Sequence, residues 1–368
     1  MRITFVLPGY PWKPVGGFRV AYEYANHLVA RGHNVAVVHA RCLPNWSPPP
    51  PPNFYRWLRK KAGQIRNLFF RPKVNWQPID ERVKMLYVPE PTERYVPDSD
   101  AVFATAWQTA ELVAKYPPEK GEKFYLVQDF EDFFGPKERL EATWKEAFKM
   151  IVISHWLYKK VVSIVGQRKD IIVIPNGINH QKFRLLNDII SRPKRVAMMY
   201  SNASYKAPED GLRALEICKR EFKDFQAVIF GPGAIPKRLP SWIEDKGTVD
   251  SETLVRLYNS ASIFLSSSVA EGFAFPPAEA MACGCAVVAT DSGGIREYAE
   301  HEETALLSPP RNPEALAENL LRVLKDDTLR IRLAQAGHER IKRFTWERST
   351  NLLEKFILSS FRCVDRRR

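Results

Sequence analysis

The chain has 368 residues, of which 45% are apolar, a composition typical of a globular protein with one or more sizeable cores and not of a disordered one. No segment approaches about 18 uninterrupted apolar residues, so the sequence predicts no membrane span. The formal net charge of +13 indicates a polyanionic partner, while five scattered cysteines without a CxxC pair predict a reduced, cytoplasmic protein with no metal site.

Short, β-branched apolar runs alternate with helical patterns in the first half of the chain. The opening run, within "MRITFVLPGY", is too short for a signal peptide and is typical of a first strand. Continuous runs of this kind are typical of parallel strands that are buried on both faces. The predicted strands are 3–7, 35–38, 85–88, 101–104, 124–127, 150–153 and 171–174.

Gly16 and Gly17 lie between the first predicted strand and a helical pattern over residues 18–31. Paired glycines allow backbone N–H groups to approach a ligand closely at such a position. An ordinary strand–helix turn explains the pair equally well, because the GxGxxG spacing of dinucleotide sites is absent.

A basic arm follows at about residues 48–73. Nine Lys or Arg and no acid occur between residues 24 and 79, and apolar side chains recur at helical spacing after five prolines. This pattern favours a helix on an anionic membrane surface over a packed helix, and over a nucleic-acid patch, for which no motif is present. The predicted contact residues for membrane or acceptor are Phe54, Trp57, Leu58, Arg59, Lys60 and Lys61.

A second strand–helix block begins after the turn-rich segment 175–178, with predicted strands at 195–200, 227–230, 262–266 and 286–290. Helices are predicted at 208–222 and 313–325, the latter capped by Asn312. Two such blocks predict two doubly wound α/β domains, 1–178 and 179–343, which bind ligands beyond the carboxyl ends of their strands. The amphipathic segment 344–368 predicts a final helix that packs on the first domain.

The stretch "EGFAFPPAE" places Glu271 and Glu279 at the two ends of an apolar segment. The residue before a proline is disfavoured in a helix, so Glu271 is predicted in a loop and Glu279 in the first turn of a helix. Both acids would then lie near a helix N-terminus that favours anions. The combination predicts a site for a ligand that is hydroxylated and phosphorylated.

Three further features are weaker candidates. Gly231 and Gly233 follow a predicted strand, and Lys206 lies in a loop where it would meet a diphosphate, although a lone lysine is more often solvated. Asp98 and Asp100 form a DxD pattern, but they immediately precede a predicted strand. Turn and strand-start roles are therefore favoured over metal binding for these two acids.

Together, these motifs resemble family 4 of the retaining glycosyltransferases over nearly the whole chain. The resemblance runs from Gly16-Gly17 through "ARGHNVAVV", "VIPNGIN", "EGFAFPPAEAMACGCAVVATDSGG" and "NPEALAENLLRVL". It implies the GT-B fold, with two facing Rossmann-like domains and a nucleotide-sugar cleft between them. It also implies hexosyl or deoxyhexosyl transfer without metal or cofactor; "YLVQDFEDFF" is similar to a subgroup that includes rhamnosyltransferases.

The resemblance assigns roles to particular residues. Glu279 would bind the ribose of the donor, Glu271 would hold hydroxyls of its sugar, and Lys206 would face the diphosphate. The remaining donor-binding positions implied are the backbone at Gly272, Phe273 and Ala274, the base loop with Thr248 and Val249, the phosphate loop at Gly16 and Gly17, and Arg19, Ser201, Gly231 and Gly233.

The sequence departs from the family pattern at two places. Ser201 stands where an arginine is common, which leaves Arg19 or Arg296 to assist Lys206. Gln128 and Asp129 replace a His-Asp pair, so Asp129 and Glu131 become the predicted catalytic acids of the first domain. A role for these two acids in capping a loop is the alternative.

The sequence therefore predicts a retaining glycosyltransferase that acts at the cytoplasmic face of the membrane. It would move a sugar from a nucleotide diphosphate to a lipid-linked or polysaccharide acceptor, with an anionic membrane and no nucleic acid as partner. Two alternatives stay open. One is a nucleotide-sugar epimerase of the UDP-N-acetylglucosamine 2-epimerase type, and the other is a non-catalytic, membrane-associated assembly module.

Overall fold

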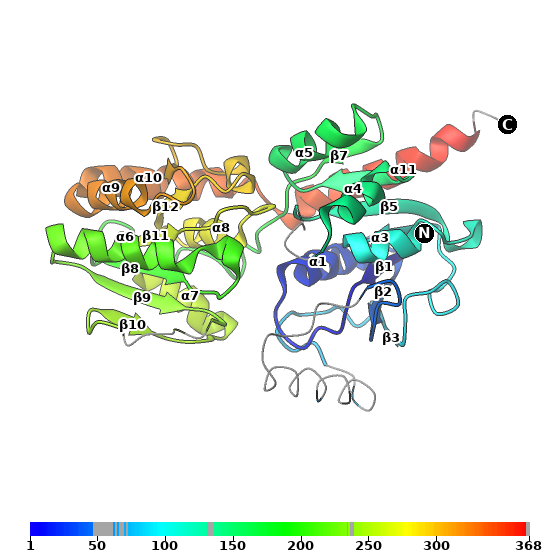
Figure 1. The fold of residues 1–368 in the computed structure, drawn as a ribbon, viewed down its shortest axis with the longest axis horizontal. Coiled ribbons are helices and arrows are strands. Elements are labelled where there is room, and N and C mark those ends of the chain that lie inside the picture. Colours follow the sequence, from blue (N-terminus) through cyan, green and yellow to red (C-terminus); the bar gives the residue numbers. More distant parts are fainter. Residues whose placement is uncertain are drawn as a thin grey trace. The chain divides into compact units, whose positions relative to one another are not determined.

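The computed structural model describes residues 1–46, 62, 65, 70, 73–130, 135–233, 235 and 239–365. The chain divides into two units (Figure 1). Unit 1 comprises residues 1–174 and 346–368, and unit 2 comprises residues 175–345. The chain therefore passes between the units twice, after residues 174 and 345, whereas the sequence analysis places its boundaries after residues 178 and 343.

Unit 1 is built on a parallel sheet in which the described strands follow the order β3-β2-β1-β4-β5-β6-β7. Its central strand β1 is buried from Ile3 to Leu7, as expected of a strand covered on both faces. The strands are Arg2–Leu7, Asn34–Ala40, Lys84–Val88, Ala101–Ala104, Glu122–Val127, Lys149–Val152 and Ile171–Val173 for β1 to β7. The helices are α1 (Gly16–Ala30), α3 (Trp107–Val113), η1 (Pro118–Lys120), α4 (Lys137–Lys145), α5 (His155–Val165) and α11 (Trp346–Asp365).

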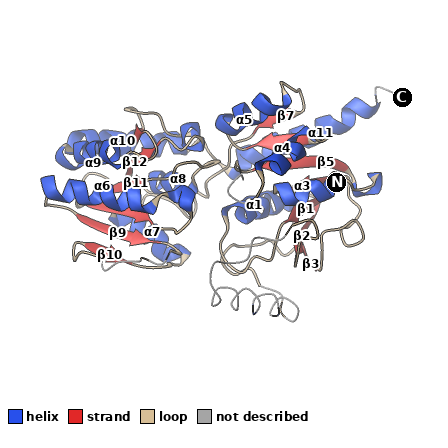
Figure 2. Ribbon diagram, in the orientation of Figure 1, coloured by secondary structure: helices blue, strands red, loops and turns tan. Residues whose placement is uncertain are grey.

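Unit 2 has a second parallel sheet with the order β10-β9-β8-β11-β12-β13, and helices flank it (Figure 2). The strands β8 to β13 are Arg195–Met199, Gln226–Phe230, Ile243–Asp245, Ile263–Ser266, Ala286–Thr290 and Ala305–Ser308. The helices are η3 (Ser204–Lys206), α6 (Pro208–Glu221), α7 (Ser251–Ser260), α8 (Phe275–Ala282), η4 (Gly294–Glu297), α9 (Pro313–Lys325) and α10 (Asp327–Ile341).

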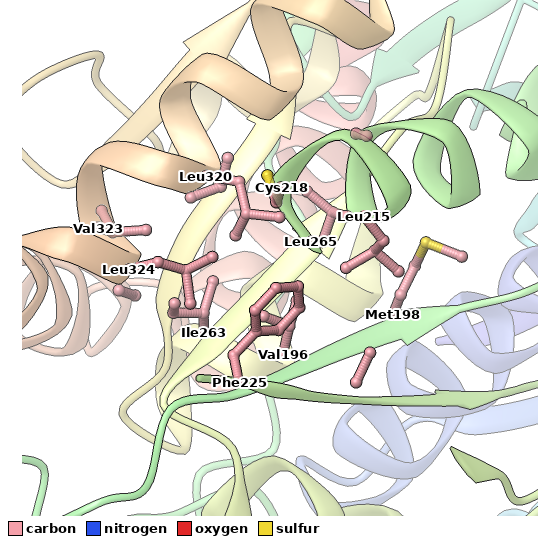
Figure 3. Close-up of a cluster of buried hydrophobic side chains, with 14 of the residues drawn as sticks. Val196, Met198, Leu215, Cys218, Phe225, Ile263, Leu265, Leu320, Val323 and Leu324 are labelled. Atoms are coloured by element: carbon pink, nitrogen blue, oxygen red, sulfur yellow. The ribbon is translucent and has the colours of Figure 1, made fainter. Parts of the chain in front are cut away.

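A cluster of buried apolar side chains forms the core of unit 2. Helices α6 and α9 pack side by side over the sheet, where Leu215 and Cys218 meet Leu320 above Val196 and Leu265 (Figure 3). All five side chains are fully buried. Burial of a leucine stabilises a fold by about 1.5–3 kcal/mol, so this cluster makes unit 2 a rigid support for the loops that leave it.

Helix α11 completes unit 1 from the far end of the chain. Arg31, which directly follows α1, donates to Glu354 at 2.8 Å and to Glu347 at 2.5 Å, and His33 contacts Glu354 at 2.7 Å. The ring of Phe356 lies 6.0 Å from that of Phe124 on β5. The apolar face of the helix is thus buried in unit 1, and its acidic residues pair with basic residues of α1 and the turn after it.

The structure confirms the predicted fold class, two doubly wound parallel α/β sheets. Two short strands were not predicted: β10, because "IED" has no apolar run, and β13. The placement of Gly16 and Gly17 before the first helix was wrong, since both lie in the first turn of α1, after extended Val15. Among the described helices, none is long and apolar enough to cross a bilayer.

Candidate functional site

The candidate site lies where unit 2 changes the direction of its winding. From β8 the chain proceeds through β9 to β10 on one side, and it then returns to β11 on the other side of β8. The loops after β8 and β11 therefore diverge, and ligands of doubly wound sheets bind at this switch point. The two loops hold each other, because Ser267 Oγ donates to the carbonyls of Lys206 and Ala207 at 3.1 and 2.8 Å.

Lys206 and Glu271, both predicted to be catalytic, meet at this point. Lys206 Nζ forms an ion pair with Glu271 Oε1, and the two side chains are only 13% and 11% exposed. Ser268 Oγ donates to the same carboxylate oxygen at 2.7 Å. Since the pair is partly shielded from water, its charges interact strongly with each other and with any anion that enters. The lysine can stabilise a phosphate, and the carboxylate can accept from hydroxyl groups.

The backbone after Glu271 is fixed by close packing. Glu271 N donates to the carbonyl of Ser292 at 2.9 Å, and Gly294 N donates to the carbonyl of Glu271 at 3.0 Å. A Cβ on Gly294 would lie 2.1 Å from the carbonyl oxygen of Gly272, so only glycine fits there. The two segments can approach each other only because residue 294 has no side chain.

Ala274 takes the left-handed conformation, with φ 62° and ψ 76°, directly before α8. Tyr298 fixes it by donating its hydroxyl to the carbonyl of Ala274 at 2.6 Å, and the ring of Phe273 lies 5.2 Å from that of Tyr298. Strain of this kind costs on the order of 1–3 kcal/mol and persists only where the surroundings impose it. The helix therefore begins at Phe275, directly after the left-handed residue.

Glu279 lies inside α8 and is 4% exposed. It is the fifth residue of the helix, so its predicted place in the first turn was wrong; the early start at Phe275 is the reason. Tyr258 Oη donates to Glu279 Oε2 at 3.5 Å. Burial, together with the negative charges of Glu271 and Glu279, raises the pKa of Tyr298 well above its usual value. The charges of Glu271 and Glu279 thus both affect Tyr298, so the two predicted acids lie near the same buried tyrosine.

Gly231 and Gly233 lie against the loop that follows β8. A Cβ on Gly231, whose φ is +136°, would lie 2.2 Å from the carbonyl oxygen of Tyr200, and one on Gly233 would lie 2.6 Å from the Tyr200 ring. Thr248 Oγ1 donates to the carbonyl of Gly231 at 3.4 Å. The loops after β8, β9 and β10 therefore meet, with half-buried Val249 next along the chain.

Ser201 and Arg296 are both engaged within unit 2. Ser201 Oγ accepts from Ala203 N at 3.4 Å, a contact within its own turn. Arg296 Nε donates to both carboxylate oxygens of Asp291 at 2.8 Å, and this bond raises the pKa of Arg296. The guanidinium of Arg296 therefore pairs with Asp291, which argues against a role for Arg296 beside Lys206 in binding the diphosphate.

In unit 1, Gly17 of the predicted phosphate loop contacts a residue that follows β5. Gln128, after β5, donates its Nε2 to the carbonyls of Gly17 and Thr105, both at 3.2 Å. Asp129 Oδ1 accepts from the N–H of Phe130 at 2.8 Å. Half-buried Arg19 lies in the first turn of α1. Glu131, together with Phe54, Trp57, Leu58, Arg59, Lys60 and Lys61, lies outside the described residues.

The two acids of the DxD pattern, Asp98 and Asp100, each form an ion pair within unit 1. Asp98 binds Lys120 at 2.8 Å, which lowers the pKa of Asp98, and Asp100 binds Arg2 at 2.9 Å. Each carboxylate thus anchors a turn beside β1 or β4. Among the described residues, no group of three or more His, Cys, Asp or Glu could hold a metal ion.

Two residues near strand ends were missed in the sequence. Buried His39, at the end of β2, contacts the Gly9 carbonyl and Tyr22 Oη at 3.1 Å each, and burial lowers the pKa of His39 to about 4. Arg311 follows β13 and donates to the carbonyl of Ser204 at 3.1 Å. Recognising β13 would have placed Arg311 at a strand end, whereas a lone histidine in an apolar run gives no such signal.

Comparison with known families and proteins points to one group. Residues 181–340 match the family "Glycosyl transferases group 1". An O-antigen biosynthesis protein of Myxococcus xanthus is 28% identical over 289 residues, 76% of this chain and 22% of that protein. A phosphatidyl-myo-inositol mannosyltransferase of Mycobacterium tuberculosis is 30% identical over 192 residues, 48% of this chain and 51% of that protein. The matches thus span about a fifth and about half of these two relatives.

Solved structures share the architecture at low sequence identity. Sucrose-phosphate synthase of Thermosynechococcus elongatus has a TM-score of 0.71 and 19% identity, and the match covers 98% of this chain and 99% of that one. Anabaena HepE, solved with UDP-glucose, has a TM-score of 0.74 and 16% identity, with coverage of 98% and 100%. At these identities the similarity shows the fold.

Proposed function

We propose that this chain, whose residues 181–340 match the group 1 glycosyltransferases and which has the GT-B fold, transfers a sugar from a nucleotide-diphosphate donor to a glycan or lipid-linked acceptor. The transfer would proceed with retention of configuration and without a metal ion. The observation that carries this proposal is the shielded Lys206–Glu271 pair at the switch point of unit 2.

The pair supplies what the reaction needs. The bond between the anomeric carbon and the phosphate oxygen breaks, and the electron pair remains on the diphosphate. Lys206 would stabilise that negative charge, which develops as the bond breaks. The acceptor hydroxyl forms the new bond on the face that the diphosphate leaves, and a diphosphate oxygen takes its proton. Attack on that face retains the configuration.

The remaining predicted residues of unit 2 suit the rest of the donor. Glu271 and Glu279 would accept from hydroxyls of the sugar and the ribose, respectively, because carboxylates form strong charge-assisted hydrogen bonds. The fixed backbone from Gly272 to Ala274 would follow the sugar and the diphosphate. Gly231 and Thr248, which share a hydrogen bond, would lie along the nucleoside.

The acceptor proposal rests on relatives and on charge. The relatives named above are an O-antigen biosynthesis protein and a mannosyltransferase of phosphatidyl-myo-inositol, which favours a polysaccharide or a lipid-linked acceptor. The net charge of +13 and the basic arm at residues 48–73 favour attachment to an anionic membrane, on its cytoplasmic face. Asp129 and Glu131 are the acids of unit 1 that we propose act near the acceptor.

The test is incubation with a panel of nucleotide sugars, with and without membrane lipid, followed by measurement of released nucleotide and of the anomeric configuration of the product. The proposal predicts nucleotide release that an acceptor stimulates, that EDTA does not affect, and that falls sharply in Lys206→Ala. An inverted product, or turnover that EDTA abolishes and a divalent ion restores, would contradict it. An altered sugar with no acceptor product would indicate an epimerase, and a failure to bind any nucleotide would favour an assembly module.

A further inference from the structure

The turn that carries Lys206 is strained at its end. Lys206 is the last residue of η3, and Ala207 follows it in the left-handed conformation, with φ 43° and ψ 52°, as the N-cap of α6. A non-glycine residue in this conformation is held there by its surroundings. The position of Lys206 therefore depends on contacts that hold η3 against α6.

Arg311 makes such contacts from another strand end. Its Nη2 donates to the carbonyl of Ser204, the first residue of η3, at 3.1 Å. Its Nη1 lies 3.4 Å from Asp210 Oδ2, in the first turn of α6. One guanidinium thus touches the elements on both sides of the joint at Lys206 and Ala207.

The backbone of Arg311 is itself unusual. It has a φ of +59°, and it lies between Pro310 and Asn312, the N-cap of α9. Among the described residues, those with positive φ that are not glycine are Ala207, Ala274, Glu302 and Arg311. Three of these four residues are connected with the candidate site. Ala207 follows Lys206, Ala274 lies in the loop after Glu271, and Arg311 contacts the turn that carries Lys206.

We infer that Arg311 is a positioning residue for Lys206, an inference that rests on the proposed function. Ser201, which also follows β8, adds no charge and contacts its own turn. Arg311 holds the lysine turn from the β13 side instead. A planar guanidinium suits this task because its fork can donate to a carbonyl and a carboxylate together. A lysine at position 311 would satisfy one of the two.

The exposure of Arg311 separates this role from one in stability. Its side chain is 55% exposed, and exposed ion pairs add little to folding free energy. Arg311→Ala should therefore unfold within about 3 °C of wild type. An effect of the substitution on diphosphate binding would then come from the site and not from loss of the fold.

The experiment measures binding of UDP, GDP, ADP and dTDP, and of the matching monophosphates, to wild type, Arg311→Ala and Arg311→Lys. For the diphosphate that wild type prefers, Arg311→Ala should raise Kd about 10-fold, a loss of the size expected for one charge-assisted contact. Arg311→Lys should lie between Arg311→Ala and wild type. The matching monophosphate, which lacks the group facing Lys206, should bind with unchanged affinity.

A double substitution tests whether Arg311 acts through Lys206. In a Lys206→Ala background, Arg311→Ala should weaken diphosphate binding by less than about 2-fold, because coupled residues are not additive. Full additivity, or a Kd for Arg311→Ala equal to that of wild type, would overturn the inference. Arg322→Ala is the matched control, since Arg322 of α9 pairs with Glu302 at 2.6 Å, and it should bind like wild type.

The two proposals fail in different ways. If wild type binds a nucleoside diphosphate but transfers no sugar, the transferase proposal fails while the binding results still decide the role of Arg311. If wild type transfers sugar and Arg311→Ala does so with equal kcat and KM, the positioning role fails and the transferase proposal stands.

Discussion

Units 1 and 2 wind their sheets in the same way but differ in what they place at the switch point. In unit 1, neutral Gln128 joins the carbonyls of Gly17 and Thr105. In unit 2, an ion pair between Lys206 and Glu271 joins the segments after β8 and β11, the counterparts of β1 and β4. The shared topology provides a place for a ligand, and the side chains decide the chemistry. We therefore expect the charge that develops on the diphosphate to be stabilised from unit 2, by Lys206, and not by Gln128 of unit 1.

The units also differ in net charge. Residues 175–345 contain 23 Lys or Arg and 22 Asp or Glu, so the rest of the chain supplies nearly all of the net charge of +13. A nearly neutral unit 2 suits a small ligand that is held by a few placed groups. A strongly basic unit 1 suits a polyanionic surface. We therefore predict that the anionic partner and the donor bind to different units, a division that the following substitutions can test.

The largest effect is expected from the charged pair. Lys206→Ala should lower kcat by about 100- to 1,000-fold, the usual cost of removing one group that stabilises charge in a transition state. Gln128→Met, which removes the contacts of Gln128 to the segments after β1 and β4 in unit 1, should cost less, because those contacts are neutral hydrogen bonds. Steady-state kinetics with the preferred donor will compare them. Equal losses would contradict the division of chemistry between the units.

The next effect concerns the charge of unit 1. Replacing Arg59, Lys60 and Lys61 by Glu should weaken binding to anionic vesicles at least about 100-fold, since each basic residue near such a surface contributes about 1 kcal/mol. High salt should release the wild type. Co-sedimentation measures both, and hydrolysis of the donor should be unchanged.

The matched control makes the same change of charge in unit 2. Arg213, Arg220 and Lys223 are exposed on or directly after α6, and their replacement by Glu should leave vesicle binding within a few-fold of wild type. If both triple variants lose binding equally, net charge alone governs attachment. If the arm variant still sediments like wild type, the arm is not the membrane contact.

A smaller effect is expected at the ribose position. Glu279→Ala should weaken donor binding by about 1.5–3 kcal/mol, or roughly 10- to 150-fold in Kd, through lost charge-assisted hydrogen bonds. Calorimetry with the donor and with the free base distinguishes the ribose contact from a general disturbance, because the base lacks the ribose. Unchanged donor affinity in a folded variant would remove Glu279 from the site.

Most of the fold was predictable from the sequence because parallel strands buried on both faces are continuous apolar runs. The apolar run that forms β8 is an example. Helix α9 was predicted from a different signal, its N-cap at Asn312. Strand β10 was not predicted, because its own residues "IED" give no strand signal and it forms by pairing with β9, an earlier segment of the chain.

The candidate site was only partly predictable. The motif around Glu271 identified the loop, but the ion pair with Lys206 depends on which strand lies beside β8, and this order is not written in local sequence. The left-handed Ala274 likewise depends on the buried Tyr298 hydroxyl that fixes its carbonyl. Contacts between distant segments were therefore what the sequence could not supply.

The smallest effect concerns how α11 closes unit 1. Hydrogen bonds from His33 and then Arg31 lower the pKa of Glu354, so the folded state favours the ionised carboxylate. The ionised carboxylate contributes its full stabilisation above about pH 4.5, the pKa of Glu354 in the unfolded chain. The stabilisation is lost as the pH falls through the lower pKa that Glu354 has in the folded state. Glu354→Gln should therefore destabilise α11 at pH 7 by up to about 1 kcal/mol, and the difference from wild type should vanish in acid.

Hydrogen exchange of the α11 amides at pH 7 and at pH 3 measures this effect without requiring the whole chain to unfold. Glu339→Gln is the control, because Glu339 lies on α10 of unit 2 and pairs with Lys342. Protection of α11 should fall in Glu354→Gln and stay unchanged in Glu339→Gln. If acid leaves the difference between wild type and Glu354→Gln undiminished, the carboxylate charge is not what docks α11, and its apolar face, with Phe356 against Phe124, closes unit 1 by packing alone.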